Sequence, residues 1–330
     1  MNAKRWIGLA IAGVLLLAST LVSFFQASME ESWEDFFGGA GEPFHERVLE
    51  TGTGSGKIAV IHVEGIIQSG ASGGLLSGGY DHQMLLDQLD HAAEDPEVHG
   101  IVLRVNTPGG GVVESDEIHD KVAAIQEDYN KPVYASMGSQ AASGGYYISA
   151  PAEQIYANPQ TITGSLGVIM SSINISELAE NWGIQEEVIK SGPYKDIMSS
   201  TRDMTDEERA ILQDLVDDAY EQFVDVIEEG RDFERDEVYD LADGRIYTGS
   251  QALEQGLIDG LGHQDDVVQA LEEALGYGNL TVVEYEANIG FSSLLGIKMN
   301  EVFSNQSQLT DIESWFRQNQ GAQLMYLYTD

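Results

Sequence analysis

Cysteine is absent from this chain of 330 residues, which excludes disulfide bonds, thiolate metal sites and a cysteine nucleophile. Basic residues are scarce, because 16 lysines and arginines face 55 aspartates and glutamates and leave a net charge of −39. Proteins that bind nucleic acid need a basic surface that displaces counterions, so this class of function is excluded. The sequence also lacks an H-E-x-x-H pattern or another cluster of metal ligands. We therefore expect neither a metal nor a cofactor.

The acidic excess predicts a heavily solvated surface that its own charge keeps soluble. Adaptation to high salt and adaptation to high pH are two further explanations, and the sequence leaves both open. A hydrophobic content of 42% is ordinary for a globular protein. The length allows one large domain or two small ones with a sizeable core.

One long apolar run, residues 6–25, contains twenty residues without a charge. As a helix it would span about 30 Å, the thickness of a hydrocarbon core. Lys4 and Arg5 precede the run, and acidic residues follow it, so the bulk of the chain should face outward. A cleaved secretory signal is the alternative. The length of the run and the lack of a clean A-x-A site favour an uncleaved anchor at 6–25, with residues 1–5 in the cytoplasm.

Beyond the anchor, residues 26–56 are mixed in character and are interpreted as a linker. From residue 57 the chain alternates apolar, β-branched runs with amphipathic stretches, which predicts an α/β domain over residues 57–285 with parallel strands joined by helices. The less regular residues 286–330 form a C-terminal tail. Strands are expected at 57–67, 100–106 and 132–137, and helices at 81–94 and 114–129. A capping box at 205–208 opens a further long helix, whose apolar side is formed by Ile211, Leu215, Ala219, Phe223 and Ile227.

Ser143 lies in the stretch GSQAASGGYYI, residues 138–148, among alanines and glycines that let another backbone approach closely. A serine by itself is a poor nucleophile and needs a base that takes its proton. The G-x-S-x-G elbow of α/β-hydrolases does not fit, because Ala141 stands where that motif has glycine. His263 is the one histidine after the serine, and its setting is that of a helix start.

A lysine can act as the base only when it is neutral, which requires an enclosed place because its reference pKa is about 10.4. Of the seven lysines, Lys190 and Lys195 are the two candidates, in the segment VIKSGPYKDIMSSTRDMT. The residues alone leave open whether either lysine is a base or a solvated loop charge.

Acyl transfer also needs backbone N–H groups that hold the developing oxyanion. The glycines of TPGGG, residues 107–111, follow a strand directly and allow the close approach that such a pocket requires. The N–H of Gly144, just after the serine, is a second candidate donor. A flexible turn is the alternative interpretation of TPGGG.

Five motifs occur in order along the chain: NTPGGG (106–111), MGSQAASGGYYIS (137–149), TGSLGV (163–168), SGPYKDIMSSTRDMT (191–205) and GRIYTGSQALEQGLIDGLG (244–262). Together they closely resemble the signal peptide peptidase A family, of the single-domain type found in Gram-positive bacteria. The resemblance covers about residues 57–285 and the anchor before them. It implies a Clp protease/crotonase-like fold and a serine protease with a Ser–Lys dyad.

Matched motif by motif, the resemblance implies that Ser143 is the nucleophile and Lys195 the general base. It implies that Ser165 orients the lysine amine, and that Gly110 and Gly144 supply the oxyanion donors. Lys190 stays as a weaker alternative base.

The resemblance also implies the setting of the reaction. The expected substrates are remnant signal peptides and other apolar or unfolded peptides, cut at the outer face of the cell membrane. Family members form homo-oligomeric rings in which a neighbouring protomer supplies the lysine, and their C-terminal tail can occupy the site. The alternatives are a crotonase-like acyl-CoA enzyme and a vestigial membrane-anchored scaffold, both of which would leave Ser143 and Lys195 idle.

Overall fold

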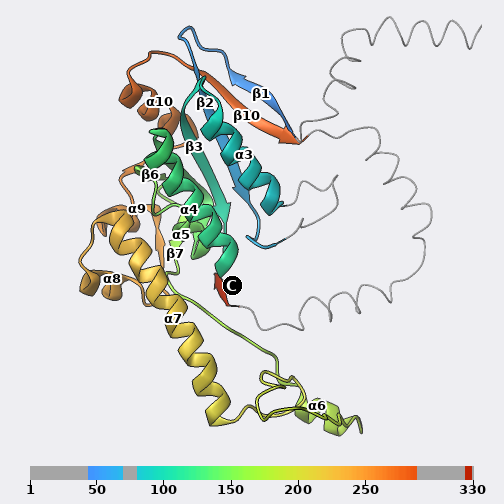
Figure 1. Ribbon diagram of the computed structural model, residues 1–330. Coiled ribbons are helices and arrows are strands. Elements are labelled where there is room, and N and C mark those ends of the chain that lie inside the picture. Colours follow the sequence, from blue (N-terminus) through green and yellow to red (C-terminus); the bar gives the residue numbers. More distant parts are fainter. Residues whose placement is uncertain (1–43, 70–79, 288–323, 329–330) are drawn as a thin grey trace, which may run out of the picture. The chain divides into compact units, whose positions relative to one another are not determined.

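The computed structural model describes residues 44–69, 80–287 and 324–328 (Figure 1). The predicted anchor at 6–25 and the N-terminus before it lie outside these ranges. Within the described ranges, no helix is long and apolar enough to cross a membrane. Glu46–Tyr285 and the described tail residues belong to one structural unit. In the other unit, His45 Nε2 lies 3.7 Å from Glu286 Oε2.

A nine-stranded, mostly parallel sheet forms the core of the larger unit. Six of its strands pair in parallel, in the order β10, β2, β3, β5, β6 and β9, and β1 lies at the edge beside β10. β7 pairs in parallel with β5 and antiparallel with β8. Separately, β4 and β11 form a two-stranded antiparallel ribbon. The strands are β1 (Phe44–Glu50), β2 (Lys57–Glu64), β3 (Val98–Thr107), β4 (Gly109–Gly111), β5 (Val133–Ala142), β6 (Gln154–Ala157), β7 (Ile162–Gly164), β8 (Ile246–Thr248), β9 (Gly260–Leu261), β10 (Thr281–Ala287) and β11 (Met325–Leu327).

Helices cover both faces of this sheet (Figure 1). On one face, α10 packs against Val60, Val102 and Tyr134, which form one buried cluster with its apolar residues. Because side chains alternate along a strand, the fully buried Ile61 and Leu103 point to the opposite face, where α3 and α4 pack side by side. The helices are α3 (His82–Glu94), α4 (Val112–Tyr129), α5 (Gly144–Tyr147), α6 (Ser176–Asn181), α7 (Asp206–Arg231), α8 (Arg235–Leu241), α9 (Gly249–Glu254) and α10 (Gln264–Leu275).

The alternation of strands and helices is confirmed, and the large sheet fits the Clp protease-like fold that the resemblance implies. Several boundaries differ from the prediction, and β2 ends at Glu64, before the predicted residue 67. β1 lies inside the stretch 26–56 interpreted as a linker, where it extends the sheet at its edge. β5 runs on to Ala142, past the predicted end at residue 137, because its last residues pair with β3 and β7.

The capping box that opens α7 is also confirmed. The Thr205 side chain accepts a hydrogen bond from the Glu208 amide, and the Glu208 carboxylate accepts one from the Thr205 amide. Figure 1 shows the N-terminal half of α7 extending away from the sheet together with the segment around α6. The predicted apolar side of α7 is therefore divided: Ala219, Phe223 and Ile227 are buried, whereas Ile211 and Leu215 are exposed.

Candidate active site

Ser143 stands at the junction between β5 and the short helix α5. Its backbone has φ 52° and ψ −114°, an unusual conformation for a residue other than glycine. The Ser143 amide donates to the carbonyl of Gly164 at 2.8 Å, and its Oγ lies 3.4 Å from the carbonyl oxygen of Gly167. The serine is 1% exposed. A strained turn held by a neighbouring strand thus fixes the position of the proposed nucleophile.

The small residues after Ser143 are required by close packing. A Cβ at Gly144 would lie 2.8 Å from the Ser115 hydroxyl, and one at Gly145 would lie 2.8 Å from the Thr107 methyl group. Both distances are too short for a real side chain. The backbone of α5 therefore approaches the end of β3 and the start of α4 more closely than any residue with a side chain would permit.

The TPGGG segment forms a strand, so its interpretation as a flexible turn is wrong. β4 lies between two neighbours, because Gly110 pairs with Ile67 on one side and with Tyr326 on the other. A Cβ at Gly110 would lie 1.8 Å from the carbonyl oxygen of Ile67. Gly109 has φ +98°, a conformation that favours glycine. The three glycines thus allow the backbone of β4 to lie between two other segments of the same chain.

Thr107 anchors this strand at its start. Its hydroxyl is buried, accepts a hydrogen bond from the Gly109 amide at 3.0 Å and lies 3.3 Å from the Gly109 carbonyl oxygen. Its methyl group packs against Gly145. The Thr107 side chain therefore contacts both β4 and α5. Sequence reasoning did not assign this residue, although threonine hydroxyls are known to bind the backbone two residues further on.

The C-terminal tail occupies the other side of β4. Met325 exchanges two backbone hydrogen bonds with Ile169, at 3.0 and 3.1 Å. The amide of Tyr328 donates to Pro108, and the amide of Val112 donates to Leu324. The tail thus runs as an extended chain between two backbone segments, the geometry in which peptides add to a sheet edge.

The register of the tail places the Tyr326 carbonyl next to the candidate oxyanion donors. Hydrogen-bonded pairs alternate in an antiparallel ladder, and the bonds of Val112 and Tyr328 make Gly110 and Tyr326 such a pair. A Cβ at Gly109 would lie 1.9 Å from the Tyr326 carbonyl oxygen and 2.6 Å from the Gly144 nitrogen. That carbonyl oxygen and the two proposed donors, Gly110 and Gly144, therefore meet in one place.

The side chain of Tyr326 fills a buried aromatic pocket. Its ring is fully buried, with centroid distances of 4.8 Å to Tyr147 and 4.7 Å to Phe223. Its hydroxyl donates to the carbonyl of Ala219 in α7 at 3.0 Å. Burial raises the pKa of both the Tyr326 and the Tyr147 phenols, so both stay protonated hydrogen-bond donors.

Ser165 follows β7 as Ser143 follows β5. The residues before the two serines, Gly164 and Ala142, are partners in the parallel pairing of these strands. The carboxyl ends of paired parallel strands lie at the same edge, so the structure brings Ser165 beside Ser143. The Ser165 amide donates to the carbonyl of Arg245 at 2.7 Å.

Lys195 lies elsewhere, in the segment that extends with α6 and the start of α7 (Figure 1). Its side chain is exposed, and within the described residues its ammonium group makes no hydrogen bond or ion pair. The structure therefore brings together Ser143, Gly110, Gly144 and Ser165, and leaves Lys195 of the same chain outside this group.

Lys190, the alternative base, is engaged by its own loop. Its ammonium forms an ion pair with Asp196 at 2.5 Å and donates to the carbonyl of Pro193 at 3.0 Å. Arg202 also binds Asp196, and these contacts hold the pKa of that carboxyl well below its usual range. These contacts occupy the Lys190 ammonium within its own loop, so this geometry disfavours Lys190 as a base.

The histidines do not complete a serine triad in the described part of the chain. His263 is the N-cap of α10, as its setting predicted. Among the residues that the structure describes, two groups of side chains could each offer a cation three ligand atoms within 4.8 Å of one another. They are Glu46, His91 and Asp95, and Asp116, His119 and Asp120. Other side chains already bind some of these carboxylates. In the first group, Lys57 forms ion pairs with Glu46 and Asp95. In the second group, Asp116 accepts hydrogen bonds from Tyr147 and Gln222.

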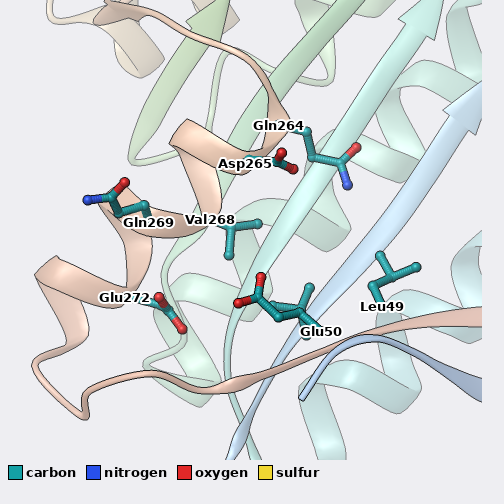
Figure 2. Close-up of a pocket in the computed structure, with 8 residues that line it drawn as sticks. Leu49, Glu50, Gln264, Asp265, Val268, Gln269 and Glu272 are labelled. Carbon is teal, nitrogen blue, oxygen red and sulfur yellow. The ribbon is translucent and has the colours of Figure 1, made fainter. Parts of the chain in front are cut away.

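A pocket of about 390 Å³ lies on another part of the molecule, between β1, β10 and α10. Figure 2 shows the residues that line it. Acidic side chains of Glu50, Asp265 and Glu272 line it, above a floor that includes Val268. The pocket shares no residue with the group around Ser143.

Comparison with known proteins shows similarity to peptidases. The sequence pattern of peptidase family S49 matches residues 125–277. The chain is 40% identical over 311 residues to a protein of Enterococcus faecium named as a signal peptide peptidase SppA, a match that covers 91% of this chain and 90% of the relative. It is 44% identical over 213 residues to a protein of Synechocystis named as a protease, covering 64% of this chain and 72% of the relative. It is also 35% identical over 218 residues to Protease 4 of Salmonella typhi, covering 66% of this chain and 34% of the relative.

Proposed function

This chain belongs to the signal peptide peptidase A family of S49 serine peptidases, and from that membership we propose that it cleaves peptides with Ser143 as nucleophile and Lys195 as general base. The family membership favours this function over an acyl-CoA enzyme or a vestigial scaffold. No metal or cofactor has a part in the proposed reaction.

In the first step, Ser143 Oγ attacks the peptide carbonyl carbon while the neutral Lys195 amine takes the hydroxyl proton. The N–H groups of Gly110 and Gly144 stabilise the oxyanion that forms. Lys195 then gives the proton to the leaving amine, which breaks the C–N bond and leaves an acyl-serine. Water, deprotonated by the same lysine, releases the second product and restores Ser143. Ser165, beside the nucleophile, orients the lysine amine.

The observation that carries this proposal is the position of the tail. A peptide chain of this protein already lies extended against β4, with the carbonyl of Tyr326 beside the two N–H groups named as oxyanion donors. A substrate bound in the same way presents its carbonyl to those donors next to Ser143. The tail therefore supports a peptide as the ligand, and it also supports a self-occupied resting state.

We propose that the lysine comes from a second copy of the chain. Lys195 stands on an exposed segment that carries several exposed apolar side chains, among them Trp182, with 74% of its surface accessible, and Ile189. Such a surface is typical of an interface with another protein. A ring in which each segment reaches the Ser143 of a neighbour would bury these side chains and complete every site.

The cellular setting is part of the same proposal. Residues 6–25 anchor the chain in the cell membrane by a single pass, and the positively charged flank keeps residues 1–5 in the cytoplasm. The peptidase domain then acts at the outer face. Its substrates are remnant signal peptides and other apolar or unfolded peptides, because these reach an anchored enzyme at that surface.

The test compares hydrolysis of an apolar fluorogenic peptide by the full-length chain and by three variants, with the assembly state of each checked. Ser143→Ala and Lys195→Ala should abolish turnover, whereas Lys190→Ala, the matched control in the same loop, should retain it. The wild-type rate should rise on the alkaline side, because only a deprotonated lysine can accept the proton. Turnover by Ser143→Ala equal to that of the wild type would refute the proposal, and turnover by Lys195→Ala would remove that lysine from it.

A further inference from the structure

The two proposed oxyanion donors are held in different ways. A donor N–H shares a planar peptide unit with the carbonyl of the residue before it, so a group that binds this carbonyl also fixes the direction of the N–H. For the Gly144 N–H, the carbonyl is that of Ser143. It accepts hydrogen bonds from the amides of Tyr146 and Tyr147, both at 2.9 Å. Both amides belong to α5, so this short helix fixes its own donor.

The Gly110 N–H depends on a separate segment of the chain. Its peptide unit contains the Gly109 carbonyl, which accepts a hydrogen bond from the Ile67 amide at 3.0 Å. The Ile67 carbonyl accepts one from the Gly111 amide at 2.8 Å. A hydrogen bond to a carbonyl also polarises its peptide unit, which makes the N–H a stronger donor. Ile67 therefore fixes and strengthens this donor from the side of β4 opposite the tail.

Ile67 lies in residues 65–69, the segment that follows β2. Its side chain is fully buried, whereas that of Ile66 is 43% exposed. At the start of the segment, the Gly65 amide donates to the carbonyl of Asn106 at 3.2 Å. This bond joins the segment to β3 on the β2 side of Ile67. A second contact is made on the other side, by Ser69.

Glu114, in the first turn of α4, binds this far end of the segment. Its Oε1 accepts hydrogen bonds from the Ser69 amide, at 3.0 Å, and from the Ser69 hydroxyl. Its Oε2 lies against Gly111, where a Cβ would collide with it. One carboxylate thus contacts both residues 65–69 and β4. The third glycine of TPGGG leaves the space that this carboxylate occupies.

We propose that Glu114 is a positioning residue that fixes the Gly110 N–H through Ile67. It holds residues 65–69 against α4, and the segment in turn directs the donor toward the oxyanion. The inference rests on the proposed function. An acidic residue in the first turn also stabilises a helix by its charge alone. That role predicts a loss of stability, whereas the positioning role predicts a selective loss of transition-state binding.

The experiment compares the full-length wild type with Glu114→Ala in peptide hydrolysis and in binding of a peptide aldehyde and the matching peptide alcohol. Ser143 adds to the aldehyde, and the oxygen of the adduct takes the place of the oxyanion, whereas the alcohol forms no adduct. Removal of an oxyanion donor costs about 100-fold or more, and a donor that is only less well directed costs less. We expect kcat and aldehyde affinity each to fall about ten-fold, with KM and alcohol affinity nearly unchanged.

Two further variants are the controls. Glu114→Gln keeps an oxygen that accepts from Ser69 and should retain most of the activity. Glu127→Ala removes the same charge from an exposed position of α4 and should behave as the wild type. Unchanged kcat in Glu114→Ala would overturn the inference. Aldehyde and alcohol affinities that fall by the same factor would also overturn it, because they would show general damage to the site.

Hydrogen exchange tests the same contact without catalysis. The amides of Ile67 and Gly111, which join the two segments, should exchange faster in Glu114→Ala and at the wild-type rate in Glu127→Ala. Unchanged exchange in Glu114→Ala would overturn the inference. If that variant does not fold, Ser69→Ala, which removes one of the two hydrogen bonds at an exposed residue, gives the same readouts. A wild type that neither cuts the peptide nor binds the aldehyde would count against the proposed function, and the exchange rates would still decide whether Glu114 holds the segment.

Discussion

At the scale of single residues, the site depends on contacts between backbone segments that tolerate no extra atom. Gly109, Gly110 and Gly144 each lie where a Cβ would approach another segment of the same chain within about 3 Å. Ser143 itself has a left-handed φ, held by the hydrogen bond of its amide to Gly164. The glycines of the family motifs therefore have a steric explanation that is independent of any likeness to relatives.

Thr107 should matter for turnover although it does not contact the proposed nucleophile. Thr107→Val keeps the shape of the side chain but removes the hydroxyl that holds Gly109, a hydrogen bond that contributes about 1 kcal/mol. We expect kcat to fall about ten-fold, because the oxyanion donors lose their fixed position. Thr107→Ser, which keeps the hydroxyl, is the matched control and should retain most of the activity. Steady-state kinetics of both variants measure this, and equal kcat values for the valine variant and the wild type would refute the positioning role.

The sequence was informative about residue types at the site but not about every contact. The sequence predicted a strand that ends at residue 137, and in the structure this strand continues to Ala142, directly before Ser143. The contact of Thr107 with α5 joins residues far apart in the chain, and no periodicity reports such a contact. Spacing also does not report which serine Lys195 would serve, because the proposed partner lies on a second copy of the chain.

At the scale of elements, Arg202 joins the segment that carries Lys195 to the start of α7. Its guanidinium binds Asp196, the residue after Lys195, and Glu208 in the capping box of α7. Glu208 therefore takes part in both the helix cap and an ion pair. Arg202 thus links the segment that carries Lys195 to the first turn of α7.

Arg202→Ala should release the lysine loop and lower turnover by about ten-fold, because the base loses its fixed approach. Arg209→Ala is the matched control in the first turn of the same helix, since within the described residues the Arg209 side chain makes no hydrogen bond. Peptide hydrolysis and the assembly state of both variants test this. Unchanged turnover by Arg202→Ala would show that the loop is ordered by other contacts.

The same contact predicts a dependence of stability on pH. Hydrogen bonds from Arg202 lower the pKa of Glu208 from 4.5 to about 2. A carboxyl whose pKa is lowered on folding stabilises the fold above its unfolded pKa, and the effect is lost as the pH falls through the folded pKa. The difference in melting temperature between the wild type and Arg202→Ala should therefore be full at pH 6 and shrink between about pH 4.5 and 2. A difference that stays constant over this range would contradict the assignment.

At the scale of the whole molecule, the net charge of −39 is the dominant feature. Repulsion among like charges destabilises a compact state, and added salt screens it. Raising the salt from about 0.1 to 1 M shortens the screening length from about 10 to 3 Å. If the acidity is an adaptation to high salt, the melting temperature of the full-length protein should rise over this range. A melting temperature that does not rise would argue against that explanation and would leave adaptation to high pH as the alternative.

The overall architecture was largely predictable, because alternating apolar strands and amphipathic helices specify a parallel sheet covered on both faces. The position of the tail was only loosely expected, since the residues LMYLYTD show no pattern that reports pairing with β4. β1 was missed for a similar reason, because as an edge strand it is mostly exposed and lacks a buried, β-branched run.

The most direct test of the central claim is to mix two inactive full-length variants, Ser143→Ala and Lys195→Ala, under conditions that let their assemblies exchange subunits. If Lys195 of one copy serves Ser143 of another, mixed assemblies regain about a quarter of the wild-type turnover, because a site works wherever an intact serine meets an intact lysine. Each variant alone should stay inactive. A mixture that stays inactive after exchange has been demonstrated would contradict a dyad shared between copies.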